Sequence, residues 1–504
     1  MGLFRTRSAA VYGIEAHLID VEVDLYNSGS ARDFITVGMP DLAVRESRER
    51  IKSALMNSGF GYPSKAVTIN LAPANVRKEG PGFDLPMALG ILGAMGTLHR
   101  SDQHLSIGEL SLDGTVRPIR GALSIAVCAR QRNVRNVIVP FENVAEAAVV
   151  EGVNVYGVKH ISEAVGVVNE PTKFEPASAA IDVEAQAEYP DFSDVRGQAT
   201  AKRALEVAAA GGHNVLLVGP PGSGKTMLAK RLAGILPPLT FEESIETTQI
   251  HSVAGQLGQG HGLLQLRPFR SPHHTVSDAG LIGGGSGTPR PGEASLAHHG
   301  VLFLDEFPEF ARNVLEQLRQ PMEEGAVTIA RANSTTRFPA RFMLVAAMNP
   351  CPCGFHGDPT RECRCTPGII QRYLAKISGP MLDRIDLHIE VPAVAYKDLR
   401  APDAAASSDY YRQRVEGARD RQQTRGYYNS LIPSAHLRTH CALDEAGERT
   451  LEMAVRRMGL SARAHDRILK VARTIADLDG KDAVSAKHLA EAVQYRSLDR
   501  TYWN

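Results

Sequence analysis

The sequence predicts an α/β protein whose central part is a parallel sheet with helices on both faces. Three apolar runs, at 214–218, 301–304 and 342–348, indicate buried strands because each is short and is followed by turn or polar residues. A helical pattern without Gly or Pro follows the first run, from Met227 to Ala233. After residue 425, helical patterns alternate with turns, which predicts a C-terminal helical bundle.

The first 170 residues show a mixed α/β pattern. Strands are predicted at 34–38 and 66–71, with an amphipathic helix over 42–56 between them. The segment 105–119 is predicted to be a hairpin that turns at Asp113-Gly114. The elements expected after it are a helix over 122–129, a strand over 137–139 and a helix from Asn143.

A chain of 504 residues is too long for one hydrophobic core, so several domains are expected. Shifts in composition predict an α/β domain over 1–170, a linker over 171–190, the central domain over 191–395, a linker over 396–425 and a helical domain over 426–504. Lys and Arg together number 56, as do Asp and Glu, so any contact with nucleic acid must be local.

The sequence gives no sign of export or membrane insertion. No apolar run is long enough to span a bilayer, and the first seven residues lack the apolar core of a secretory signal. Four of the six cysteines are crowded into one short segment, unlike a disulfide framework. We therefore expect a cytoplasmic protein with no membrane partner.

The most informative motif is the glycine-rich loop between the first apolar strand and its helix. It consists of Gly219, Pro220, Pro221, Gly222, Ser223, Gly224, Lys225 and Thr226. The backbone N–H groups of such a loop converge on one point, and the helix N-terminus adds a positive dipole there. Lys225 is placed to reach β- and γ-phosphates, and the Thr226 hydroxyl to take one Mg²⁺ position. The motif predicts a nucleoside triphosphate site but does not distinguish ATP from GTP.

The other two strands end in polar residues that suit the same chemistry. Asp305 and Glu306 follow the 301–304 strand, where Asp305 can hold Mg²⁺ through water and Glu306 can polarise the attacking water. A solvated acidic turn after a buried strand is the alternative. Asn349 ends the 342–348 strand, from which its amide can bind the γ-phosphate or the water.

Four further segments carry a family resemblance: Gly292 to Gly300, Leu382 to Asp386, Arg267 to His274, and Asn349 to Gly354. With the first two, the central domain resembles an AAA+ ATPase of the branch of the magnesium-chelatase ATPase subunit. With the last two, essentially the whole chain resembles the ComM/YifB family. The resemblance implies ATP and Mg²⁺ as cofactors, an AAA+ module with a C-terminal helical lid, and an N-terminal α+β domain of the Lon/S5 type.

The resemblance also implies roles for two arginines. Arg384 matches the position of an arginine finger that enters the neighbouring subunit's site, and a surface salt bridge with Asp383 or Asp386 is the alternative. Arg463 matches a sensor-2 arginine in the first turn of a lid helix that Ser461 can cap, with Arg467 as the competing candidate. A finger that acts in trans requires a ring, so the family implies a hexamer.

Two inserts are typical of this branch. Segments 326–331 and 337–341 predict a β-hairpin, which in related ring motors points into the central pore. Arg331 and Arg337, expected near its tip, can contact phosphates without reading sequence, or can simply be exposed arginines. The glycine-rich stretch 240–287 is the second insert, and the sequence assigns it no role.

The cysteine cluster indicates a separate metal site. Cys351, Cys353, Cys363 and Cys365 form a C-x-C pair, nine intervening residues and a second C-x-C pair. Four thiolates can close a tetrahedral Zn²⁺ site, and its role is expected to be structural because no position stays open. Disulfides or buried free thiols are the alternatives, and His356 can replace one cysteine.

The N-terminal domain lacks the chemistry that its own resemblance suggests. Segments 77–82 and 113–121 resemble the proteolytic domain of Lon-type proteases, which needs a serine activated by a lysine. Gly82 stands where that serine is expected, and Leu123 to Ile125 stand where the lysine is expected. A peptidase activity is therefore not predicted.

Three functions remain in competition. The leading one is a hexameric ATP-driven DNA translocase or branch-migration helicase in homologous recombination or natural transformation, with single-stranded or branched DNA and recombination proteins as partners. Arginines in the C-terminal helical part, from Arg412 to Arg467, favour it locally. The second is an AAA+ remodeller or chaperone that acts on a partner protein. The third is a nucleotide-dependent scaffold, against which the presence of Glu306 argues.

Overall fold

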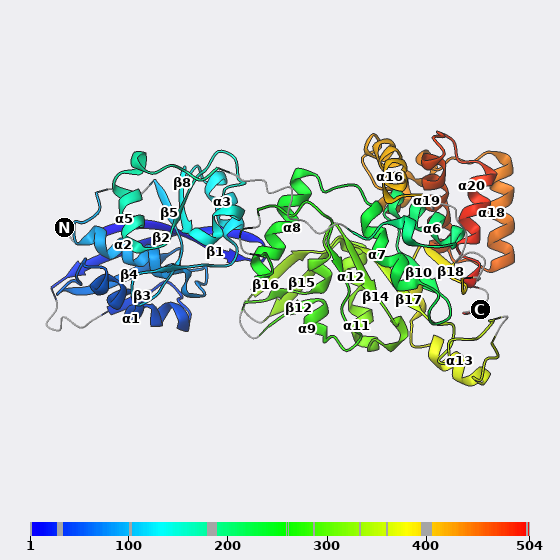
Figure 1. Cartoon of the computed structure of the whole chain (residues 1–504), viewed down its shortest axis with the longest axis horizontal. Helices are drawn as coiled ribbons and strands as arrows, with labels where there is room; N and C mark the ends of the chain where they lie inside the picture. Colours follow the sequence, from blue (N-terminus) through cyan, green and yellow to red (C-terminus); the bar gives the residue numbers. More distant parts are fainter. Residues whose placement is uncertain are drawn as a thin grey trace.

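The structure is a computed structural model that describes residues 3–27, 34–99, 103–178, 189–258, 260, 262–285, 288–331, 334–358, 361–394, 406–499 and 502. The chain is elongated, with the N-terminal α/β part at one end, the central parallel sheet in the middle and the C-terminal helices at the other end (Figure 1). The predicted fold class is confirmed in all three parts.

The N-terminal part is built on a seven-stranded mixed sheet in the order β3-β4-β2-β1-β5-β8-β9. Its strands are β1 (Leu3–Tyr12), β2 (Glu15–Tyr26), β3 (Phe34–Val37), β4 (Ala66–Ala72), β5 (His104–Ser106), β8 (Asn136–Pro140) and β9 (Asn154–Val158). Its main helices are α1 (Leu42–Asn57), α2 (Asp84–Ala94), α3 (Ala122–Gln131) and α5 (Ile161–Asn169). Alternating apolar residues of β2, from Ile19 to Leu25, are buried, as expected of a strand with one face on the core.

Two predictions for this part need correction. The segment 105–119 is only partly a hairpin, because β6 (Glu109–Leu110) and β7 (Val116–Arg117) pair around the turn while β5 joins the main sheet beside β1 and β8. The helix predicted from Asn143 is a 3₁₀ turn followed by the short α4 (Val144–Ala147). The other predicted strands and helices are confirmed.

The central part is a five-stranded sheet, all parallel, in the order β11-β14-β17-β10-β18. Its strands are β10 (Val215–Val218), β11 (Phe269–Arg270), β14 (Val301–Leu304), β17 (Met343–Met348) and β18 (Leu387–Glu390). The three apolar runs form the strands β10, β14 and β17, as predicted, and every residue of these strands is buried. Since parallel strands end at one edge, the polar residues that follow them come together there.

The C-terminal part is helical, as predicted, and it begins earlier than expected. Its helices are α16 (Ser408–Gln423), α17 (Ser434–His440), α18 (Glu445–Met458), α19 (Ala462–Leu478) and α20 (Ala486–Gln494). The helix α16 occupies most of the segment predicted as the second linker and packs on α6 (Ala199–Gly211) of the central part. Residues 396–405 of that predicted linker and residues 179–188 of the first linker lie outside the described residues.

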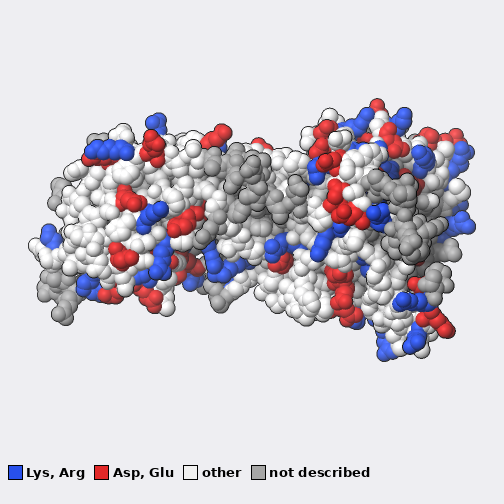
Figure 2. All heavy atoms as spheres, viewed as in Figure 1, with Lys and Arg blue, Asp and Glu red and all other residues white. Residues whose placement is uncertain are grey.

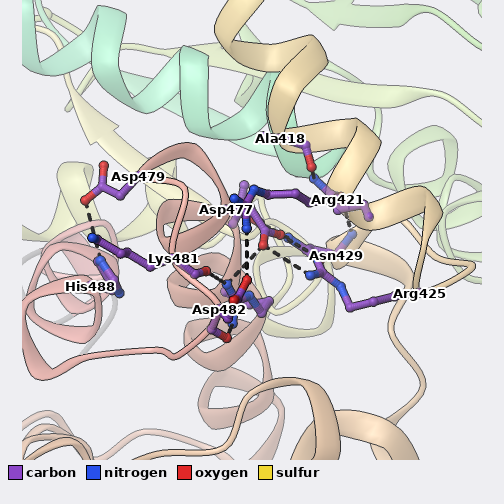
Figure 3. Close-up of polar contacts among 12 residues, drawn as sticks. Ala418, Arg421, Arg425, Asn429, Asp477, Asp479, Lys481, Asp482 and His488 are labelled. Atoms are coloured by element: carbon purple, nitrogen blue, oxygen red, sulfur yellow. Dashed lines mark hydrogen bonds and ion pairs between the residues drawn. The ribbon is translucent and has the colours of Figure 1, made fainter.

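A buried ion-pair network holds these helices together (Figure 3). Asp477 of α19 is 3% exposed and accepts hydrogen bonds from Arg425, which follows α16, and from Asn429. Arg473, one turn earlier on α19, is 2% exposed and donates to Asp477 over 3.0 Å and to the carbonyls of Lys481 and Asp482. Every charge is thus matched by an opposite charge or a hydrogen bond, which is the condition for burial.

The N-terminal part contacts the central part at two places. At the β1–β2 turn, a Cβ at Gly13 would lie 3.0 Å from the Arg337 carbonyl oxygen. The helix α8 (Phe241–Ala254) forms the second contact, where the Gly121 N–H donates to the Ser252 hydroxyl over 3.0 Å and that hydroxyl donates to Glu146. Burial raises the pKa of Glu146 above its usual value. The 240–287 insert, for which no role was predicted, therefore supplies a docking helix.

Candidate functional site

The glycine-rich loop joins β10 to α7 (Lys225–Ile235), as the sequence predicts. Gly219 must lack a side chain, because a Cβ there would lie 2.1 Å from the Val391 carbonyl oxygen. Gly222 and Gly224 have φ values of 77° and 92°, in the left-handed region, and nothing lies within 4 Å of where their Cβ atoms would stand. The loop therefore leaves open space in front of its backbone, as an anion-binding loop requires.

Lys225 lies inside this loop. Its side-chain nitrogen Nζ donates to the carbonyl oxygens of Gly219 at 2.7 Å and Pro220 at 2.9 Å, and to Asn349 Oδ1 at 3.1 Å. Burial lowers the pKa of the Lys225 ammonium from its ordinary value, and the nearby charge of Asp305 opposes that shift. The structure thus brings together Lys225 and Asn349, two predicted site residues that are 124 positions apart.

The two predicted Mg²⁺ ligands also meet. Thr226 Oγ1 donates to Asp305 Oδ2 over 2.8 Å, at the exposed mouth of the loop. A hydroxyl and a carboxylate are hard oxygen donors of the kind that Mg²⁺ prefers, and one or two protein oxygens beside substrate phosphates are its usual coordination. The donor set at Thr226 and Asp305 therefore fits that ion.

Glu306 follows Asp305 at the same strand edge, with a backbone φ of 53° in the left-handed region. Its side chain is 59% exposed, and His274 Nδ1 lies 3.2 Å from Glu306 Oε2. The ring of His273 packs on that of His274, with centroids 4.1 Å apart. The strand β11 ends just before this segment and runs parallel to β14, so residues 271–274 reach the same edge as Glu306.

His274 was not predicted as a site residue. The sequence contains a signal that could have found it, since two adjacent histidines follow a short strand beside the strand that bears Asp305 and Glu306. That signal depends on knowing that β11 pairs with β14, which the short Phe269–Arg270 run does not reveal.

Arg384 lies at the opposite end of the sheet from the loop. It precedes β18, near Asp386, whose carboxylate accepts the N–H of Asn214 just before β10. Its guanidinium is 7% exposed, donates to the Pro380 carbonyl over 2.6 Å and pairs with Glu323. A pair with Asp383 or Asp386, the alternative raised by the sequence, is not among its contacts in the described structure.

Arg463 occupies the first turn of α19, and the Ser461 hydroxyl caps that helix by accepting the Ala464 N–H over 3.2 Å. Arg463 is exposed, while Arg467 pairs with the buried Asp386. The carboxylate of Asp386 also holds the backbone just before β10, whereas the phosphate loop follows that strand. Arg467 therefore lies toward the end of β10 that is opposite the phosphate loop.

The four cysteines of the cluster converge although twelve residues separate Cys351 from Cys363. The Sγ of Cys351 lies 3.3 Å from that of Cys353 and 3.7 Å from that of Cys363, and Cys353 and Cys363 are 3.6 Å apart. With Cys365 included, all four Sγ atoms lie within 4.8 Å of one another, and none is in a disulfide. Tetrahedral zinc with Zn–S bonds of about 2.3 Å separates its sulfurs by about 3.8 Å, so the cluster is compatible with zinc.

The predicted hairpin exists, as β15 (Ala326–Arg331) paired with β16 (Ser334–Pro339). Arg331 pairs with Ser334 beside the tip, but Arg337 pairs with Thr328 three pairs away, so its predicted place near the tip is wrong. Both arginines are exposed, and Arg331 donates to the Gly285 carbonyl. Lys and Arg are interspersed with Asp and Glu on the face drawn in Figure 2, so no broad basic surface surrounds the hairpin there.

None of the described helices combines the length and the apolar character that crossing a bilayer requires.

Three family models match consecutive parts of the chain. The description "Subunit ChlI of Mg-chelatase" applies to residues 21–143, "Magnesium chelatase, subunit ChlI" to 191–399, and "Magnesium chelatase, subunit ChlI C-terminal" to 405–496.

Similar proteins span the same length. Competence protein ComM of Haemophilus influenzae is 45% identical over 99% of this chain and 98% of its own. The uncharacterized protein YifB of Escherichia coli is 42% identical over 99% of this chain and 98% of its own. The magnesium-chelatase 38 kDa subunit of Rhodobacter capsulatus is 25% identical over 59% of this chain and 84% of its own.

Proposed function

The chain belongs to the ComM/YifB family of magnesium-chelatase-like AAA+ proteins, and from that premise we propose that it is a hexameric, ATP-driven motor that moves on DNA. The observation that carries the proposal is the pair of contacts at one strand edge, Lys225 with Asn349 and Thr226 with Asp305. These side chains meet in front of a loop whose glycines leave room for phosphates.

Each residue of this edge has a place in ATP hydrolysis. Lys225 binds the β- and γ-phosphates, which replace the loop carbonyls as acceptors for its ammonium group. Thr226 and Asp305 hold Mg²⁺, which neutralises charge on the phosphates when it is bound. Glu306 orients and polarises the attacking water, with His274 holding its carboxylate, and Asn349 binds the γ-phosphate or that water.

The ring is proposed because Arg384 lies far from the loop of its own chain. Arg384 precedes β18 beside Asp386, whose carboxylate binds the backbone at the start of β10, and Arg467, one turn after Arg463 on α19, pairs with the same carboxylate. In a closed ring, this end of one subunit can face the phosphate loop of the next. Arg384 then stabilises charge on the neighbour's γ-phosphate, which requires it to exchange Glu323 for that phosphate.

DNA is proposed as the substrate on two grounds. The β15–β16 hairpin carries exposed arginines, which bind phosphates without regard to sequence. The printed name of the Haemophilus influenzae relative, a competence protein, supports a role in natural transformation or recombination. A partner protein is the second candidate substrate, favoured by the match of the central domain to the magnesium-chelatase subunit.

Steady-state ATPase activity distinguishes between the two candidate substrates, DNA and a partner protein. The purified full chain is assayed alone and with single-stranded, duplex and branched DNA at one fixed salt concentration, because phosphate contacts depend strongly on salt. Lys225→Ala protein serves as the control for contaminating ATPases. The proposal expects branched or single-stranded DNA to stimulate hydrolysis, with no activity in the variant. A rate of hydrolysis that is the same with and without each DNA would overturn the proposal that DNA is the substrate and favour a partner protein.

A further inference from the structure

The cysteine loop lies between β17 and α13 (Pro367–Leu374), and its described residues are 351–358 and 361–365. It lies directly against the phosphate loop. The contact is made by Gly354, whose φ is +87°, and Pro221. A Cβ at Gly354 would stand 2.5 Å from Pro221 Cδ and 3.2 Å from its Cγ. The two loops therefore touch so closely that no side chain fits between them.

The same loop begins two positions after the residue that contacts Lys225. Asn349, whose Oδ1 accepts from Lys225 over 3.1 Å, is two positions before Cys351, which is fully buried at the end of β17. On the far side of the loop, burial raises the pKa of Tyr373 of α13, and the nearby backbone of Asn349 opposes that shift. The cysteine loop thus holds both Pro221 and Asn349, from two sides of the nucleotide site.

The four cysteines of this loop differ in burial but converge in space. Cys351 is its only buried cysteine, since Cys353, Cys363 and Cys365 are partly exposed. No disulfide joins the four thiols, although their sulfurs converge within 4.8 Å. Four thiolates at this separation repel one another unless a cation neutralises them, and a soft divalent ion such as Zn²⁺ suits four sulfur ligands.

We propose that Zn²⁺ on the four cysteines makes nucleotide binding dependent on metal, because the metal-closed loop positions Pro221 and Asn349. The role goes beyond structural support, since the metal acts on the loop that receives the phosphates. This inference rests on the proposed nucleotide site, and it assigns to the cysteines a positioning role in that site. Metal binding contributes to folding a loop that has no other crosslink.

The first test compares the full chain with and without zinc. Metal content is measured by atomic absorption, and the affinity for a fluorescent ATP analogue is measured in excess Mg²⁺ before and after a zinc-selective chelator. One zinc per chain is expected, with affinity about tenfold weaker after its removal and restored by one equivalent of Zn²⁺. Zinc-loaded protein that binds no nucleotide would overturn the proposed function as well. Equal affinity with and without zinc, or no bound zinc, would overturn this inference alone.

A pair of glycine variants tests the contact itself. Gly354→Ala is expected to keep its zinc and bind the ATP analogue about tenfold more weakly, because the added methyl displaces Pro221. Gly357→Ala is the matched control, since Gly357 lies in the same loop with φ of +78° but has nothing within 4 Å of its Cβ position. Both alanines carry the same backbone strain, so equal affinities for the two variants would contradict the proposal.

Discussion

At the scale of single residues, the nucleotide site depends on side chains that meet only through the sheet. Lys225 follows β10 across the phosphate loop, and Asn349 follows β17, which pairs with β10 in parallel. Asp305 follows β14, on the other side of β17. Burial disfavours the charged form of Lys225, and three oxygen acceptors offset that cost. A phosphate that enters the loop supplies full negative charge in place of carbonyl dipoles, so binding is expected to be strong.

Variants of Lys225 and Glu306 are predicted to affect different steps, nucleotide binding for Lys225 and ATP hydrolysis for Glu306. Lys225→Ala removes the ammonium that contacts the phosphates, so the affinity for a fluorescent ATP analogue should fall below detection. Glu306→Gln keeps the shape of the side chain but removes its negative charge, so affinity should remain while turnover falls by about 10²-fold or more. Near-normal turnover in Glu306→Gln would show that another group activates the water.

His274 is predicted to act on turnover and not on binding. Its Nδ1 is 3.2 Å from Glu306 Oε2, so His274→Ala frees a carboxylate that is already 59% exposed. We expect about a tenfold loss of kcat with unchanged affinity for the ATP analogue. His273→Ala is the control, because His273 packs on the same ring without a contact to Glu306 in the described structure. An equal loss of kcat in the two variants would show that packing of the two imidazole rings, and not the contact of His274 with Glu306, causes the effect.

Some residues of the nucleotide site can be predicted from the sequence and others cannot, for a physical reason. The phosphate loop, Asp305 and Asn349 follow strands whose apolar runs are long enough to recognise, so their convergence can be deduced from parallel pairing. The contact of His274 with Glu306 could not be deduced, because β11 is two residues long. The position of Arg384 at the far end of the sheet likewise depends on tertiary packing.

At the scale of elements, local patterns predict helices and strands well and their contacts poorly. The hairpin β15–β16 was expected from its sequence, but its contact with Gly13 joins residues more than three hundred positions apart. The long β1–β2 hairpin that makes this contact was not predicted. Its first strand places Arg5 and Arg7 opposite Glu22 and Asp20, and such charged residues obscure the apolar alternation.

The helical part is predicted to depend on the buried network around Asp477 (Figure 3). Asp477→Ala leaves Arg473 buried without its carboxylate partner, so the free energy of unfolding should fall by about 3–5 kcal/mol. Urea denaturation followed by circular dichroism measures the change. Asp482→Asn is the control, because the Asp482 side chain is fully exposed and its pair with Arg421 lies in solvent, so the midpoint should not move. A similar shift in both variants would contradict the network's role.

At the scale of the whole molecule, the proposed ring follows from where the predicted ATPase residues lie. Lys225, Thr226, Asp305 and Glu306 lie at one edge of the sheet, and Arg384 lies at the other. The N-terminal part contacts both the insert helix α8 and the β15–β16 hairpin. A motion of that hairpin during the ATP cycle is therefore expected to move the N-terminal part as well.

Mixing two inactive variants tests whether Arg384 acts in trans. Arg384→Ala should bind the ATP analogue normally and lose turnover by about 10³-fold. In a mixed ring, a Lys225→Ala subunit donates its intact Arg384 to the phosphate loop of an Arg384→Ala neighbour. Partial recovery of ATPase activity is therefore expected, with a maximum at intermediate ratios. Mixtures that stay inactive, although mass measurements show mixed rings, would rule out Arg384 as the finger.

Strand displacement measures ATP-driven movement on DNA. A forked DNA with one fluorescent strand is incubated with the full chain, ATP and Mg²⁺, and release of the labelled strand is followed over time. ATP-driven movement predicts release by the unaltered protein, and none by Glu306→Gln protein, which still binds ATP. No release by protein that hydrolyses ATP rapidly in the same mixture, or equal release by both proteins, would contradict it.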